Sequence, residues 1–191
     1  MLPFSQWQVL THPRPGALLA PPTGRGGPPS PELQALNAER LEEDRLAVEG
    51  LATTSLLSVA VGALGALRAK GARSRAFHVT STAVHLFVLG TAVVGCVAIE
   101  AQDPKRLGTE DSVQRGFRLL RLLKAGMASD VGAMAAGALS LLGARWRRHD
   151  GLAGAGTSLL LHGALLLLFD TGLFLRNAWQ QRRVLESTGL S

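Results

Sequence analysis

Hydrophobic residues gather into four long, almost uncharged stretches, which short clusters of charge separate from one another. The stretches cover residues 50–67, 76–99, 125–144 and 151–175. A helix of about 20 residues crosses a hydrocarbon core of roughly 30 Å, because each residue adds about 1.5 Å. The pattern therefore predicts an all-α polytopic membrane protein, with four transmembrane helices in a compact bundle within residues 32–179.

Two further segments repeat apolar positions with the period of a helix. Residues 30–49 and 109–124 both place apolar side chains on one face and charged ones on the other. Ser30 followed by Pro31 is typical of the start of a helix. Each segment either lies in the headgroup region or runs directly into the span that follows. For residues 30–49, a solvated charged helix is the plainer interpretation.

The two ends of the chain are expected to lack stable structure. Residues 1–31 hold eight of the nine prolines, and such a segment cannot bury enough apolar surface to offset its ordering entropy, so we predict that it is disordered. The prolines also interrupt the continuous apolar core that a secretory signal requires. Residues 180–191 are expected to form a polar tail that frays.

Composition agrees with a membrane protein and argues against other classes. Hydrophobic residues make up 47% of the chain and charged residues 18%, and the gathering of the charges into short clusters between long uncharged runs is the signal of a membrane protein. The net charge of +6 comes mainly from arginines beside the apolar stretches, and no basic soluble module is present, so we expect no nucleic-acid partner. Trp146 and Trp179, just beyond apolar stretches, are candidate anchors at the membrane interface. Cys96 is the only cysteine and cannot form an intrachain disulfide.

Small residues recur on one face of the first and third stretches at the spacing of a helix. These residues are Ser58, Gly62 and Ala66, and then Gly126, Ala133 and Gly137. Such faces allow close packing within a bundle, or against a second copy of the chain or another membrane protein. Asp130 shares the second face and is expected to point at a close helix contact and not at lipid.

Four ionisable residues lie inside the apolar stretches and form two layers. Consecutive spans run in opposite directions, so the spacing along the chain gives relative depth. His85 and His162 fall at similar depth, nearer the side of the two short basic loops. Asp130 and Asp170 are both about five residues from the side that carries the termini. Charged groups at such depth are costly and need partners.

The histidine layer has two interpretations. Two imidazoles from facing helices can hold a haem iron, which makes His85 and His162 a candidate cofactor pair. A hydrogen bond between helices that fixes their register is the simpler interpretation. We expect no cofactor and no metal.

The acidic layer also has two interpretations. Asp130 and Asp170, with Glu100 as a third acid, are candidates for a proton or cation site in a small transporter. The alternative is charge pairing with long basic side chains near the same side, those of Arg121, Lys124 and Arg176.

Catalysis finds little support in the sequence. Serine, histidine and aspartate all occur, but neither a glycine-flanked serine elbow nor a two-histidine zinc motif is present. We therefore expect a non-enzymatic membrane protein with a structural or partner-binding role. The alternative is the transporter that uses Asp130 and Asp170.

Three phrases of the sequence resemble an uncharacterised group of bacterial four-span membrane proteins, classed as a domain of unknown function. They are LNAERL at 36–41, SDVGAMAAG at 129–137 and GAGTSLLLHGALLLLFD at 154–170. The resemblance extends over residues 36–179 and implies a multi-pass protein of the bacterial inner membrane. It assigns no catalytic or binding residue, and it argues against haem because that group is not described as cytochromes.

The orientation of the chain in the membrane is predicted from the density of cations. Residues 68–75 and 145–148 hold seven of them, opposed only by Asp150, although the side of the termini holds more in total. Short loops follow the positive-inside rule most reliably, so we expect these loops in the cytoplasm. Alkaline phosphatase fused after Ser191 and expressed in a bacterium should then be strongly active, and an inactive fusion would contradict this orientation.

Overall fold

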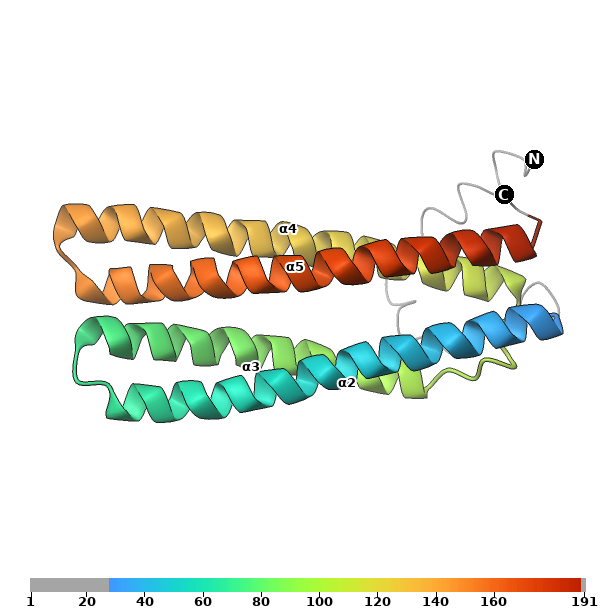
Figure 1. The fold of residues 1–191 in the computed structure, drawn as a ribbon, viewed down its shortest axis with the longest axis horizontal. Helices are drawn as coiled ribbons and strands as arrows, with labels where there is room; N and C mark the ends of the chain where they lie inside the picture. The colour runs from blue at the N-terminus through green and yellow to red at the C-terminus, as the bar shows by residue number, and fades with distance from the viewer. Residues whose placement is uncertain (1–27, 190–191) are drawn as a thin grey trace. The chain divides into compact units, whose positions relative to one another are not determined.

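The computed structural model describes residues 28–189 and contains four long helices there (Figure 1). They are α2 (Pro31–Arg68), α3 (Ala72–Glu100), α4 (Thr109–Arg147) and α5 (Asp150–Ser187). Each is long and apolar enough to cross a membrane, and the described chain is all-α as predicted. The prediction of disorder concerns residues 1–31, of which residues 1–27 lie outside the described part of the chain.

Each of the four predicted spans lies within one helix. The amphipathic segments 30–49 and 109–124 continue without a break into the spans that follow them, in α2 and α4 respectively. Ser30 caps α2 as predicted, because its Oγ accepts a hydrogen bond from the backbone N–H of Leu33 at 3.2 Å. The helix α3 ends at Glu100, four residues ahead of Pro104.

The predicted frayed tail is wrong for residues up to 187, since α5 continues to Ser187. Val184 is completely buried, and Gln180 and Gln181 are almost so. The sequence pattern is misleading here because two adjacent glutamines and two arginines precede the short apolar pair, Val184 and Leu185, that packs into a core.

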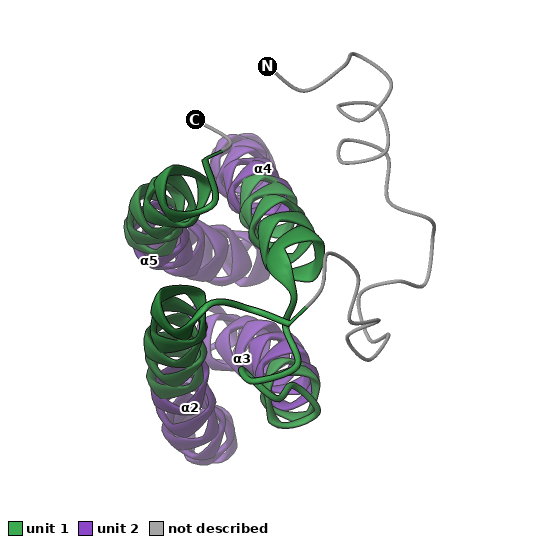
Figure 2. Ribbon diagram, turned by 90° about the vertical axis from the view of Figure 1, so that its right-hand side faces the viewer, with its two compact units in different colours: residues 1–47, 95–124, 172–191 green, residues 48–94, 125–171 purple. Residues whose placement is uncertain are grey.

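The chain divides into two compact units, coloured separately in Figure 2. Within the described residues, unit 1 holds 28–47, 95–124 and 172–189, and unit 2 holds 48–94 and 125–171. The helix α2 has 38 residues and is therefore about 57 Å long, nearly twice the thickness of a hydrocarbon core. Helices of this length supply an apolar part to unit 2 and a polar part to unit 1.

Unit 1 has the interior of a small soluble helical bundle. Leu33, Leu36, Val113 and Val184 form its apolar core. Polar side chains lie buried beside this core and are joined by hydrogen bonds. The amide of Asn37, for example, donates to the Leu107 carbonyl at 3.1 Å and accepts from the Ser112 hydroxyl at 2.6 Å. The packing of unit 1 therefore depends on polar complementarity as well as on apolar contact.

Charge pairing joins the helices of unit 1 at Asp44. Its two carboxylate oxygens accept from Arg115 at 2.8 Å and from Arg176 at 3.0 Å. Arg40 is buried nearby and donates to the Gln181 side chain at 3.3 Å. Burial, with the positive charge of Arg115 as a smaller cause, lowers the pKa of Arg40 to about 10, and the negative charge of Asp44 partly opposes the shift. Asp44 is thus the main negative charge in an arginine-rich interior.

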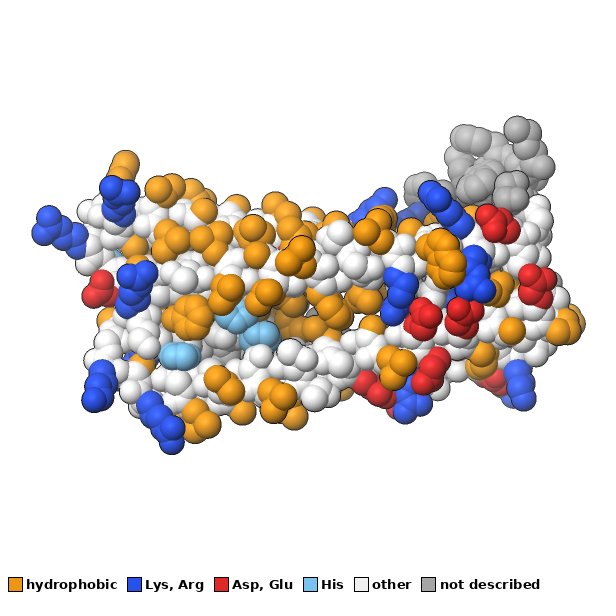
Figure 3. All heavy atoms as spheres, in the orientation of Figure 1, with side chains coloured by type: hydrophobic (Ala, Val, Ile, Leu, Met, Phe, Trp, Pro, Cys, Tyr) orange, Lys and Arg blue, Asp and Glu red, His pale blue; other side chains and the backbone are white. Residues whose placement is uncertain are grey.

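Unit 2 shows the opposite distribution of side chains. Its buried residues include serines, His162 and Asp130, whereas large apolar side chains are exposed along its helices (Figure 3). Phe87 is 72% exposed and Leu168 71%. In water this arrangement would be unfavourable, but it suits a surface that contacts lipid.

Helices of unit 2 come into close contact at glycines, which have no side chain to hold the backbones apart. A Cβ atom at Gly137 of α4 would lie 2.8 Å from the carbonyl oxygen of Gly156 in α5. A Cβ at Gly163 of α5 would lie 3.0 Å from the carbonyl oxygen of Asp130. Between α2 and α3, a Cβ at Gly62 would lie 2.5 Å from the hydroxyl of Thr82. The predicted small-residue faces therefore pack within the chain at Gly62 and Gly137.

The Asp44 pairing can be tested by Asp44→Asn. The change leaves Arg115 and Arg176 without their shared carboxylate in a mostly buried site, so the free energy of unfolding should fall by about 2–4 kcal/mol. Asp103→Asn is the matched control, because it breaks an exposed pair with Arg106 and should cost less than about 1 kcal/mol. Denaturant unfolding of the full chain in detergent measures both, and equal losses would contradict the account.

The α4–α5 contact can be tested by Gly137→Ala. The added methyl group meets the backbone of Gly156, so the free energy of unfolding should fall by about 1–3 kcal/mol. Gly132→Ala on the same helix is the control, because a Cβ there meets nothing within 4 Å and alanine favours a helix. If both variants unfold at the same denaturant concentration, the close contact does not stabilise the protein.

Candidate functional site

The acidic site lies on the contact between α4 and α5 in unit 2. Asp130 of α4 is buried, with 8% of its surface exposed. The carboxylate of Asp170 in α5 packs directly against Gly126, one helical turn before Asp130, at a position that leaves no room for a Cβ atom. Gly163 of α5 in turn packs against the backbone of Asp130, so the two acids lie along the same stretch of the α4–α5 contact. The structure thus brings together the two acids that the sequence placed at equal depth.

Asp130 lacks the partners that a buried carboxylate normally has. Its Oδ2 atom is buried and accepts no hydrogen bond from the part of the chain that the structure describes. Neither Asp130 nor Asp170 forms an ion pair with a residue between 28 and 189. A charged carboxylate in this position would be poorly compensated.

Two of the three cations expected to neutralise these acids are engaged with other groups. Arg176 pairs with Asp44 and lies 3.6 Å from Glu43. The Nζ of Lys124 lies over the ring of Phe174, at 5.5 Å from its centroid. Glu100, the third acid considered for this layer, is the exposed last residue of α3.

The two histidines also meet, on the other polar layer of unit 2. His85 of α3 and His162 of α5 contact edge to face, with ring centroids 4.8 Å apart. His162 Nδ1 is 2.7 Å from the Ser158 carbonyl oxygen, which can only accept, so this nitrogen carries the proton. In the neutral ring, Nε2 then accepts from the Ser81 hydroxyl at 3.1 Å. The bond to Ser81 joins α3 to α5, as the simpler interpretation of this layer expected.

This geometry does not fit the haem interpretation. Two axial imidazoles hold a haem iron from opposite faces of the porphyrin, which must lie between their rings. Here the rings touch, and both nitrogens of His162 are already hydrogen-bonded. His85 Nδ1 is buried without a hydrogen bond, but one free nitrogen does not make a ligand pair.

Three site residues were not singled out from the sequence. The Ser81 hydroxyl and the Ser158 carbonyl form the hydrogen bonds of His162, and Gly163 lets α5 approach the backbone of Asp130. Spacing along α5 could have placed Ser158 beside His162, four residues later, whereas Ser81 lies four residues before His85 but binds His162. The bond from Ser81 to His162 joins two helices, and spacing along a single helix does not reveal such a pair.

The chemistry open to the acidic site is the binding of a proton or a small cation. Two carboxylates on one helix contact in an apolar surrounding repel each other when both are charged, and a bound proton reduces the repulsion. Among the described residues, no group of three or more histidine, cysteine, aspartate or glutamate side chains could hold a metal ion. The pair therefore offers few ligands to a metal but suffices for one proton.

Comparison with protein families matches residues 50–171, more than half of the chain, to a family of unknown function, DUF6992. The match is narrower than the 36–179 that the sequence phrases suggested, and it begins where the first apolar stretch begins. Comparison with curated proteins and with solved structures gave no match. The chain belongs to the DUF6992 family, whose function is unknown.

Proposed function

We propose that the chain is a four-span integral protein of the bacterial inner membrane and that its Asp130–Asp170 pair binds a proton during coupled transport. The four apolar helices and the exposed apolar surface of unit 2 support insertion in a membrane. The bacterial inner membrane is supported by the resemblance of the sequence phrases. The short basic loops support an orientation with both termini outside.

One observation carries the transport proposal: the Oδ2 of Asp130, buried on the same helix contact as Asp170, has no hydrogen-bond partner among the described residues. A purely structural acid at this depth would be paired with a cation or saturated with donors. Protonation replaces the absent partner, because a protonated carboxyl group can donate a hydrogen bond and because it removes one of the two negative charges of the pair.

A proton suits the pair better than a metal cation. Magnesium and calcium require six or more oxygen ligands, and the helix backbone around the pair has its carbonyls engaged in helical hydrogen bonds. Two carboxylates provide too few oxygens for such an ion, whereas one shared proton needs only two. Coupling to a second solute would then depend on whether the pair is protonated.

A second candidate function is a non-enzymatic structural or partner-binding role. The Ser81–His162 hydrogen bond and the glycine contacts favour it, because both hold helices in a fixed register. The faces of Gly62 and Gly137 are occupied within the chain, so a second copy or another membrane protein would need a different face. Gly132 of α4, which has open space around it, lies on such a face.

The two candidates differ in the effect of Asp130→Asn combined with Asp170→Asn. If the pair binds the transported proton, the full-length protein in vesicles should move protons down an imposed pH gradient, and the double variant should lose at least about 90% of this flux. The measurement is the fluorescence of a pH-sensitive dye trapped in the vesicles. Folding should be preserved, because asparagine keeps the volume and removes a charge that the site does not compensate.

Asp150→Asn is the matched control, since it removes an exposed acid of unit 2 and should leave the flux unchanged. Absence of flux from the unmodified protein would remove the transport proposal. An unchanged flux in the double variant would show that the protons follow another route. The first result, with a fully folded protein, would favour the structural role, whereas the second would show that the aspartate pair takes no part in the flux.

A further inference from the structure

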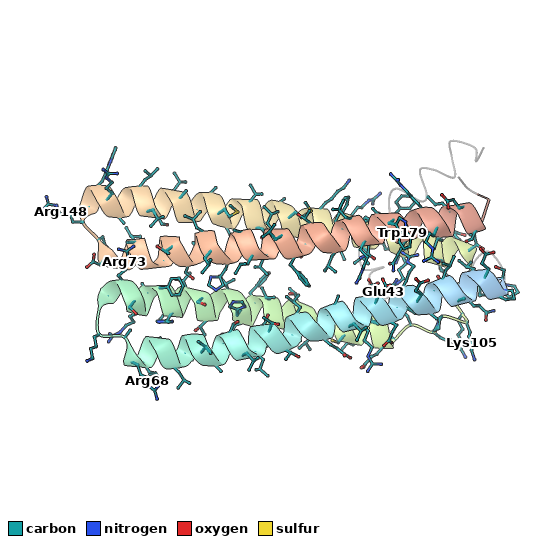
Figure 4. The ribbon with its side chains drawn as sticks, in the orientation of Figure 1. Glu43, Arg68, Arg73, Lys105, Arg148 and Trp179 are labelled. Carbon is teal, nitrogen blue, oxygen red and sulfur yellow. The ribbon has the colours of Figure 1, made fainter. Side chains whose placement is uncertain are left out.

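The loops that join α2 to α3 and α4 to α5 expose seven cations beside one acid. The acid is Asp150, and the cations are Arg68, Lys70, Arg73, Arg75, Arg145, Arg147 and Arg148. All seven are exposed, and none forms an ion pair with an acid of the described chain. Figure 3 shows basic side chains gathered around this end of unit 2, and Figure 4 labels Arg68, Arg73 and Arg148 there.

A close backbone contact joins the two loops into one face. The carbonyl oxygen of Arg73, in the first turn of α3, packs against Gly154 in the second turn of α5 and would collide with a Cβ atom there. The cations of residues 68–75 and of residues 145–148 therefore lie side by side. Their positive potentials add, and the uncompensated charge makes the face attract anions.

Several arginines of unit 1 differ from these cations, because they form ion pairs with acids. Arg115 and Arg176 pair with Asp44, and Arg183 pairs with Glu39 at 2.9 Å. The total number of cations is thus a poor guide to free charge. The free positive charge that the described structure shows in unit 2 is concentrated on the face of the two loops.

An exposed tryptophan marks the depth at which the face would lie. Trp146, between Arg145 and Arg147, is 90% exposed. An indole in this state is unfavourable in water but is stable among lipid headgroups, where its apolar ring and its N–H are both accommodated. Arginine beside tryptophan at the end of an apolar helix is therefore suited to a charged lipid surface.

We propose that the face formed by residues 68–75 and 145–148 binds the headgroups of anionic phospholipids. The guanidinium groups donate paired hydrogen bonds to phosphate oxygens, and Trp146 enters the headgroup layer beside them. A lipid is favoured over an acidic protein because the cations follow directly on the apolar helix ends and the tryptophan is exposed among them. The site is distinct from the Asp130–Asp170 pair and does not depend on the transport proposal.

The test compares the retention of phosphatidylglycerol and of phosphatidylcholine with equal acyl chains by the full-length protein in detergent, measured by native mass spectrometry. Phosphatidylglycerol should be retained more strongly, and added salt should reduce the difference. Arg145→Gln with Arg147→Gln should weaken retention of phosphatidylglycerol by about tenfold to 30-fold, because each lost cation contributes about 1 kcal/mol. Arg68→Gln with Lys70→Gln should have a similar effect if the two loops form one face.

Lys105→Gln with Arg106→Gln is the matched control, since it removes two exposed cations from the connection between α3 and α4. It should leave retention unchanged. Equal retention of the two lipids, or an equal loss in the control, would overturn the proposal. Stronger retention of a polyglutamate peptide than of phosphatidylglycerol, at equal concentrations of negative charge, would assign the face to an acidic protein partner and would also overturn it.

Discussion

The close approach of α4 and α5 at glycine is the constraint on which the candidate site depends. Gly137, Gly156 and Gly163 bring two backbones together, and Gly126 gives the carboxylate of Asp170 its position. In lipid the hydrophobic effect contributes little to the association of helices, so close backbone contacts of this kind supply much of the packing between them. The same contact removes water from Asp130, which makes its missing hydrogen bond costly.

Two kinds of polar interior follow from one set of helices. In unit 1, buried side chains such as Asn37 and Asp44 find several partners each, as in a soluble protein. In unit 2, His162 is satisfied by two serines, whereas Asp130 is not satisfied by the described residues. This difference separates residues that hold helices in register from the acid that we propose binds a proton.

The sequence predicted the helices and the two polar layers, because period, length and charge placement are local properties. It did not predict the continuation of α5 to Ser187, since the packing of Val184 depends on Leu33 and Val113, far away in the chain. For the same reason it assigned Arg176 to the aspartates of the spans and missed its pairing with Asp44. Spacing along one helix gives depth, but the choice among partners at one depth requires the neighbouring helices.

Infrared spectroscopy of the full-length protein in vesicles tests the central claim most directly. A protonated carboxyl group has a carbonyl stretching band separate from that of a carboxylate, and the account predicts such a band at neutral pH. It should disappear in Asp130→Asn or in Asp170→Asn, because the proton belongs to the pair. A spectrum with only carboxylate bands, or a protonated band that persists when both aspartates are replaced, would contradict the claim.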